Sequence, residues 1–294
     1  MTLEKRLSSK SPDDLSITIR NLRFRFDGDD AARDGNARTR RWWHGGDPVA
    51  TAFFNALSAT FPDGEKFFMD SVREYRHLTS EPLRSQIKDF VGQEAVHSRE
   101  HREFNALAAD AGYDIARLEA RTQRVIALGK RNAKIRQLAA TCALEHFTAI
   151  LAHALLEADS TDLTGAPDEA KRMWSWHAME ELEHKAVAFD TMMVATRNWS
   201  SARRYLLRTV TMVASTLLFF WTIGANMASL YREDRINTPA TWWRTAKYLL
   251  GKPGVLRRCF FPYLQYYRPG FHPWDHDDRD LLTATEAKYG LAAA

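Results

Sequence analysis

A helical pattern with few breaks runs from about residue 51 to residue 231, and it constrains the fold of this chain more than any other feature. Proline and glycine interrupt the pattern at a few joints, at 61–64, 79–82, 112 and 165–168. These joints predict four helices, at about 64–78, 82–111, 131–158 and 168–197. Because the joint at 79–82 is short, we expect the first two helices to be antiparallel neighbours.

The spacing of the four expected helices indicates a bundle. Residues 112–130 form a longer connection that is itself partly helical, as ARLEARTQRVIAL suggests. A four-helix bundle with one long crossover between its second and third helices has this arrangement. The predicted fold class is therefore all-α.

Glutamate and histidine recur on these helices in a matched order, which is one Glu, one Glu-x-x-His, one Glu and one Glu-x-x-His. Residues three apart on a helix share a face, so each Glu-x-x-His pair can reach one point in space. Carboxylates that bridge and neutralise, with one imidazole for each metal, suit two metal ions held between four helices. The predicted ligands are Glu65, Glu94, His97, Glu145, Glu181 and His184.

A third Glu-x-x-His, Glu74 to His77, serves as an internal control. Glu74 lies nine residues after Glu65, which is about 180° around a helix at roughly 100° per residue. It cannot face the same core as Glu65, so we expect it on the surface. Glu145, in contrast, lies within the nearly uncharged run LAATCALEHFTAILAHALL, where a glutamate is costly unless it is paired or binds metal.

Two further histidines share the ligand faces. His101 follows His97 by four residues, and His177 precedes Glu181 by four. Each is a candidate extra ligand, a partner that orients a carboxylate, or an acid/base that faces the substrate, and we predict them as catalytic residues. Glu180 and Glu183 fall off the ligand stripe, and we expect them to meet solvent or basic neighbours.

Four blocks of the chain, FPDGEKFF, QEAVHSREH, ALEHFTAILA and WSWHAMEELEHKAVAFD, together with the later YYRPGFHPWDHDD, resemble a known bacterial family. The family is called predicted metal-dependent hydrolases and is similar to the ferritin-like di-metal carboxylate proteins. The resemblance covers roughly residues 50–278. It implies a ferritin-like bundle with a metal site at the six residues above, but it implies little about the reaction.

The ligand set leaves three functions open. A carboxylate-rich site with one histidine per metal suits two irons that use O₂ to oxidise a hydrophobic or amphiphilic small molecule, and the ligands favour this function slightly. The alternative is a hydrolase in which the metals generate hydroxide at neutral pH, since the chain lacks a Gly-x-Ser-x-Gly nucleophile motif. The third is a metal store or stress protein. Iron is the favoured metal, with manganese and zinc as alternatives.

The C-terminal third predicts the kind of partner. Residues 197–268 hold twelve Lys and Arg against two acidic residues, and this excess favours an anionic partner. Residues 209–230 carry no charge and reach about 33 Å as a helix, so they suit either a membrane span or a fifth helix packed on the bundle. The basic and aromatic residues that follow suit an anionic membrane surface or a lipid-like substrate, while no nucleic-acid-binding module is recognisable.

These patterns divide the chain into three expected regions. Residues 1–50 are polar and partly disordered, although ITIRNLRFRF within them alternates like a short strand; 51–200 form the di-metal bundle; and 201–294 form the hydrophobic helix and its basic, aromatic extension. Two cysteines and an N-terminus without an apolar core indicate a cytoplasmic protein, with association with the inner face of the membrane as an alternative. A cluster of His272, His276, Asp275, Asp277 and Asp278 is expected to be a polar turn rather than a second metal site.

Overall fold

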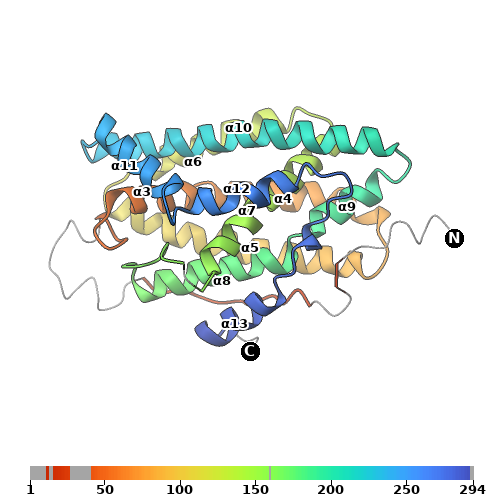
Figure 1. The fold of residues 1–294 in the computed structure, drawn as a ribbon, viewed down its shortest axis with the longest axis horizontal. Helices are drawn as coiled ribbons and strands as arrows, with labels where there is room; N and C mark the ends of the chain where they lie inside the picture. Colours follow the sequence, from red (N-terminus) through yellow and green to blue (C-terminus); the bar gives the residue numbers. More distant parts are fainter. Residues whose placement is uncertain (1–10, 13–15, 27–40, 159, 292–294) are drawn as a thin grey trace.

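The computed structural model describes residues 11–12, 16–26, 41–158 and 160–291, and the regular structure in these ranges is entirely helical (Figure 1). This confirms the predicted all-α class. The α-helices are α3 (Pro48–Ser58), α4 (Phe61–Arg73), α5 (Leu83–Asp110), α6 (Ile115–Gly129), α7 (Lys134–Leu156), α8 (Asp168–His184), α9 (Val187–Ala195), α10 (Ser201–Glu233), α11 (Pro239–Leu250), α12 (Val255–Gln265) and α13 (Arg279–Tyr289).

Helices α4, α5, α7 and α8 form the bundle that the sequence predicts. α4 packs against α5 and α7, and α8 packs against α7 and α5. Their contact surfaces are apolar, with fully buried side chains such as Phe90, Leu138 and Met173. The long connection between α5 and α7 is the helix α6, as its sequence suggests. Ferritin-like connectivity beyond this arrangement stays a prediction.

Several helix boundaries differ from those expected, and α4 ends at Arg73, five residues before the expected end at 78. The first helix begins at Phe61 with Pro62 in its first turn, where the missing N–H costs nothing, and the residues before it form the separate helix α3. The fourth expected helix divides into α8 and α9 around Lys185, whose buried ammonium donates to the carbonyl of His276 and to the carboxylate of Asp278. No proline or glycine stands at this break, so the sequence carries no local signal for it.

The segment 16–26 is not the strand that its alternation suggested, since none of these residues has strand structure. It is an extended segment whose polar groups bond the bundle rather than another strand. The N–H of Thr18 donates to Glu183 on α8, and the N–H of Phe24 donates to Glu100 on α5. Ile17 and Phe24 join the core.

The C-terminal helices lie against the bundle and cover part of it. α10 packs along α7 and α3, α12 packs on α7, and α13 packs on α8 (Figure 1). Two helices of the described chain, α7 and α10, are long and apolar enough to cross a membrane. Most of the apolar stretch of α7 is buried, 67%, as in a core helix, whereas only 28% of that of α10 is buried.

Candidate metal centre

The six residues that the sequence selects as ligands come together at the middle of the bundle. α4 supplies Glu65, α7 supplies Glu145, and α5 and α8 each supply a Glu-x-x-His pair. All six side chains are buried. Glu94, His97, Glu181 and His184 each offer one donor atom, and these four atoms all lie within 4.8 Å of one another. Glu65, His97 and His177 form a second group of this kind. Glu145 joins them through His184, with 3.1 Å between its Oε2 and the imidazole Nδ1.

The polar atoms at this centre are not satisfied by the protein. Within the described part of the chain, the buried atoms that lack a hydrogen-bond partner include Glu65 Oε1, both carboxylate oxygens of Glu94, His97 Nδ1, Glu145 Oε1, Glu181 Oε2 and His184 Nε2. A buried polar atom without a partner costs on the order of 1–3 kcal/mol, and more when it is charged. Since all of these atoms are oxygen or imidazole nitrogen, the donor set fits one or two divalent cations.

The pKa values of Glu65, Glu94 and Glu145 are all raised, because these carboxyl groups are buried beside other carboxylates. Burial, followed by repulsion from Glu181, Glu145 and other neighbouring carboxylates, raises the pKa of Glu94 well above its usual value. Burial likewise raises the pKa of Glu65 well above normal and that of Glu145 to about 7. A bound cation would reverse this situation, because it favours the ionised form of each carboxylate.

Glu181 and His184 behave in the opposite way. Burial would raise the pKa of Glu181, but the charge of His184 and the hydrogen bond from His177 outweigh it and lower the pKa to about 2. Burial would also lower the pKa of His184, but Glu181 and Glu145 outweigh it and raise the pKa to about 9. In the metal-free protein the His184 imidazolium therefore acts as a counter-charge inside the centre.

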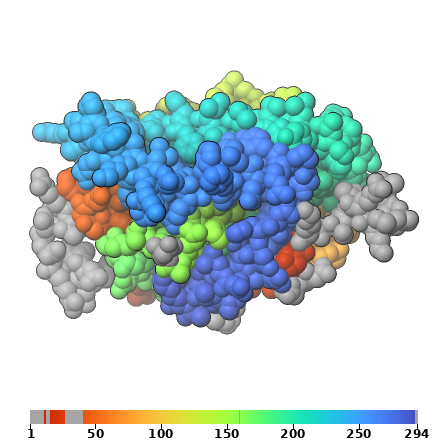
Figure 2. Space-filling model, viewed as in Figure 1, coloured from red at the N-terminus to blue at the C-terminus, as the bar shows by residue number. Residues whose placement is uncertain are grey.

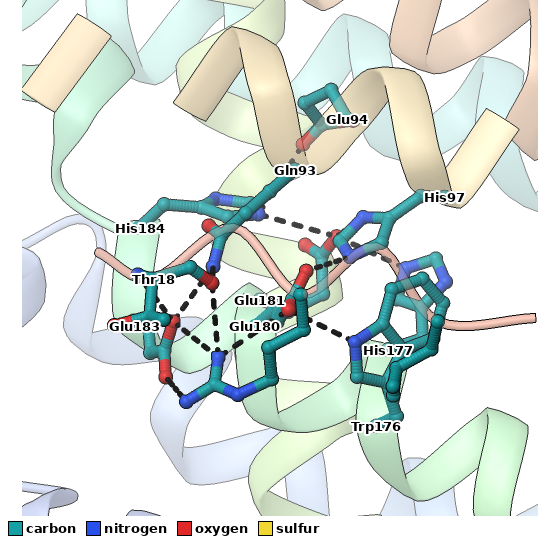
Figure 3. Close-up of polar contacts among 12 residues, drawn as sticks. Thr18, Gln93, Glu94, His97, Trp176, His177, Glu180, Glu181, Glu183 and His184 are labelled. Atoms are coloured by element: carbon teal, nitrogen blue, oxygen red, sulfur yellow. Dashed lines mark hydrogen bonds and ion pairs between the residues drawn. The ribbon is translucent and has the colours of Figure 1, made fainter. Parts of the chain in front are cut away.

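Glu180 orients one of the predicted ligands, a role that the sequence analysis missed. Its Oε2 lies 2.9 Å from His97 Nε2, and its Oε1 accepts a hydrogen bond of 2.9 Å from the Trp176 indole (Figure 3). A carboxylate that accepts from one ring nitrogen fixes the tautomer of a histidine and leaves the other nitrogen for a metal. The nitrogen left on His97 is Nδ1, which faces Glu181 at 3.7 Å.

The expectation that Glu180 and Glu183 meet solvent is wrong, while the expectation of a basic neighbour is confirmed. Both are buried, and Arg20 from the extended segment lies 3.3 Å from Glu180 and 2.8 Å from Glu183. Gln93 also donates to Glu183, at 2.7 Å. The Arg20 guanidinium lowers the pKa of Glu180, but burial has the larger effect and raises this pKa to about 7. α8 is buried continuously from Met173 to His184, since the segment 16–26 and α13 cover the side that would otherwise face water.

His101 and His177, predicted as catalytic, link the centre to a hydrogen-bonded chain. His177 Nε2 lies 3.0 Å from Glu181 Oε1, and His177 Nδ1 lies 2.6 Å from His101 Nε2. His101 Nδ1 then lies 2.9 Å from Ser58 Oγ, and Ser58 donates to Asn105 Oδ1 at 2.6 Å. Asn105 Nδ2 in turn donates a hydrogen bond to Glu119, whose side chain is only partly buried.

The directions of these hydrogen bonds place the protons. Asn105 Nδ2 donates to the carbonyl of Ser58 and to Glu119. Asn105 Oδ1 therefore faces the Ser58 hydroxyl and accepts the one hydrogen bond that this hydroxyl can donate. Ser58 therefore accepts from His101 Nδ1, and His101 Nε2 lies against His177 Nδ1. Since a carboxylate can only accept, His177 Nε2 donates to Glu181.

The other histidine and acidic clusters lie outside the centre. Glu74 is exposed, 3.6 Å from Lys134, as the sequence predicts. His146 is buried against the carbonyl of Pro262. From the C-terminal cluster, His276 and Asp278 meet His153, and the three offer atoms close enough to bind a metal. The Lys185 ammonium already pairs with Asp278, which disfavours a second cation at this carboxylate.

Comparison with known proteins yields one match. A family model described as predicted metal-dependent hydrolase matches residues 19–277, which is most of the chain and includes every residue of the centre. No curated protein and no solved structure matches the chain.

Proposed function

Because the chain belongs to the family of predicted metal-dependent hydrolases, we propose that it is a hydrolase whose reaction takes place at the carboxylate and histidine centre of the bundle. The observation that carries the proposal is the set of buried oxygen and nitrogen atoms that have no hydrogen-bond partner among the described residues. They belong to the residues that the sequence predicts as ligands, which are Glu65, Glu94, His97, Glu145, Glu181 and His184.

Two divalent metal ions at this position would activate water near neutral pH and polarise the bond to be cleaved, which suits hydrolysis of an ester, amide or phosphoester. Their ligands would be the six residues above. Glu180 would hold the His97 ring with Nδ1 toward the metals, and Arg20 would balance the charge of Glu180 and Glu183 outside them.

His177 is suited to proton transfer in this reaction. It lies beside Glu181 and also lines the adjoining cavity, so its Nε2 proton is close to the space that a substrate would occupy. A general acid near the leaving group accelerates hydrolysis by donating a proton as the bond breaks. His101, whose Nε2 lies 2.6 Å from the other nitrogen of His177, would hold the His177 ring in this position.

Oxidation of a small molecule by two irons and O₂, which the ligand set alone favours slightly, stays a prediction. The same is true of metal storage. The family description favours hydrolysis over both. The identity and number of the metals separate the three, because O₂ chemistry requires a redox-active metal whereas hydrolysis proceeds with zinc or manganese.

The test begins with protein purified without chelators, with metal per chain measured by mass spectrometry. The protein, and samples reloaded with zinc, manganese or ferrous iron, are then assayed against p-nitrophenyl esters, anilides and phosphodiesters. We expect metal-dependent release of nitrophenol or nitroaniline from at least one class, and His177→Gln should lower kcat by about 10²–10⁴-fold while metal content is unchanged. Metal-independent release, or O₂ consumption without any hydrolysis, would overturn the proposal.

A further inference from the structure

An apolar cavity of about 60 Å³ adjoins the centre. His177 and Glu181 line one part of it, while Phe219 of α10, Tyr248 of α11 and Val255 of α12 line another. The cavity therefore extends from the proposed reaction site to the layer of C-terminal helices. α3 and α7 supply most of the remaining wall through aromatic and aliphatic side chains such as Phe54 and Leu151.

The chemistry of the wall restricts what the cavity can hold. Apart from His177 and Glu181, its polar groups are the side chains of Thr148, Tyr248 and Asp162 and the indole N–H of Trp174, and Asp162 is already paired with Arg258. A site with an apolar wall and a few convergent polar groups at one place is typical of ligand pockets. Taking roughly 10–15 Å³ for each water-sized group, the cavity accommodates about four to six methylene groups.

We propose that this cavity binds the apolar chain of the substrate, and that the substrate is an amphiphile whose hydrolysable group lies beside His177 and Glu181. The proposal rests on the proposed hydrolase function for the identity of the reacting group. The apolar chain itself is assigned from the cavity alone.

Binding of straight-chain carboxylates from acetate to dodecanoate, measured by calorimetry on the protein as purified, tests the proposal without any turnover. Each methylene that enters the cavity should tighten binding by about fourfold until the cavity is filled, at roughly six carbons. Ala152→Phe, which fills the cavity from α7, should end this increase about two carbons earlier, and Leu155→Ala should extend it. Ala116→Phe, at an exposed position on α6, is the matched control and should leave the series unchanged.

Affinity that does not depend on chain length, or that responds equally to Ala116→Phe and Ala152→Phe, would overturn the cavity proposal. The hydrolase proposal fails separately. If the chain-length series is as expected and no ester, anilide or phosphodiester is cleaved, the cavity assignment holds and the hydrolase assignment falls.

A second, independent observation concerns the outer surface of α10, α11 and α12, which lie next to one another in the space-filling view (Figure 2). Of the seventeen exposed large apolar side chains in the described ranges, thirteen belong to these three helices. On α10 they include Leu206, Val210, Val213, Leu217 and Trp221, whose spacing of three and four residues places them on one stripe. Trp243 and Phe261 are the most exposed of the thirteen, at 73% each.

Charge identifies the partner that this outer surface fits. Exposed basic side chains accompany the apolar ones on all three helices and their connections, among them Arg203, Lys247, Lys252 and Arg257. The only acidic residues between 197 and 268 are Glu233 and Asp234, and Asp234 is paired with Arg41. Exposed Trp, Phe and Leu together with Lys and Arg are typical of a surface that lies in the headgroup region of an anionic membrane.

We infer that the outer surface of α10–α12 docks on an anionic lipid bilayer, with α10 lying along the membrane rather than across it. The packing of α10 along α7 and α3 supports this orientation, because the opposite side of the same helix is held by the bundle. The cavity lies beneath these helices, so docking would bring it close to the lipid phase.

Flotation of the full chain with phosphatidylcholine vesicles, with and without about 30% phosphatidylglycerol, tests the docking. We expect flotation with the anionic vesicles that is weakened by salt, because headgroup attraction is screened. Leu217→Glu with Trp221→Glu should abolish it and Lys247→Gln with Arg257→Gln should reduce it, whereas Leu107→Glu, at an exposed position on α5, should not change it. No flotation would overturn the docking, and a stable dimer that Leu217→Glu dissociates would show that a second copy and not a membrane covers this surface.

Discussion

Three buried glutamates lie within one turn of α8, and they belong to two groups of carboxylates whose charges are compensated in different ways. Glu181 faces the centre of the bundle, where Glu65, Glu94 and Glu145 leave oxygens without partners in the described structure. Glu180 and Glu183 face the other side, where Arg20 supplies a positive charge from within the chain. The first group has the composition of a site that binds an external cation, and the second is a site whose cation belongs to the protein.

Burial and charge alone therefore do not identify a metal ligand. Glu180 is as deeply buried as Glu94, and burial raises the pKa of both. What separates them is the hydrogen-bond environment. Both oxygens of Glu180 accept hydrogen bonds, from Trp176, Arg20 and His97, whereas neither oxygen of Glu94 has a hydrogen-bond partner among the described residues, and its nearest cationic neighbour is His184 Nε2 at 3.3 Å.

Removal of a ligand should give the largest effect. We expect Glu94→Gln, Glu145→Ala or Glu181→Ala to reduce bound metal from its wild-type level to near zero, as measured by mass spectrometry per chain. Glu74→Ala, outside the bundle core, should retain full metal content. Equal metal in all four variants would mean that the carboxylates of the centre do not bind it.

Arg20→Met should give the largest loss of stability. It leaves Glu180 and Glu183 buried without their cation, and breaking a buried ion pair on one side typically costs about 3–5 kcal/mol. Urea unfolding should detect this as a lower midpoint with an unchanged slope. Adding Glu183→Gln should restore part of the stability, and Arg23→Met, which removes an exposed arginine of the same segment, is the control. A midpoint equal to that of the wild type would contradict the role assigned to Arg20.

Glu180→Ala should have an intermediate effect that appears in metal affinity. Loss of the carboxylate that orients a ligating histidine typically weakens metal binding by about 10–100-fold. Glu180→Gln should be milder, because its amide oxygen can still accept from His97 Nε2. Competition with a chromophoric chelator measures both. If the two variants lose the same affinity, charge rather than orientation is what Glu180 contributes.

We expect the smallest effect from a change of pH. It is also the effect that shows most directly whether metal binding is linked to the release of protons. Burial raises the pKa of Glu145 to about 7, so protons compete with metal below this pH. The apparent affinity for metal should therefore rise between pH 6 and pH 7, by up to about tenfold for each proton displaced. Above pH 7 the contribution of Glu145 to this rise should level off. Calorimetry in buffers of different ionisation enthalpy would measure the protons released. Affinity that does not change between pH 6 and pH 8 would contradict the raised pKa.

Much of the centre could be predicted from the sequence because helical geometry converts spacing into direction. Three residues separate Glu94 from His97 and Glu181 from His184, so each pair projects from one side of its helix whatever the rest of the fold does. The nearly uncharged surroundings of Glu145 predicted its burial in the same way. The all-α class followed from the joints, since proline and glycine act locally on the backbone.

Tertiary structure decided everything that depends on what lies against a helix from elsewhere in the chain. Glu180 and Glu183 have the local pattern of a solvated face, yet the segment around Arg20, some 160 residues earlier in sequence, buries and neutralises them. The chain from Glu181 through His177 and His101 to Ser58 likewise joins three helices that no spacing rule relates. At the break after His184, a distant carboxylate, that of Asp278, holds Lys185. Sequence determines which side chains can share a direction, because that geometry is local, whereas the partner that satisfies each buried charge is a long-range contact that only the folded chain creates.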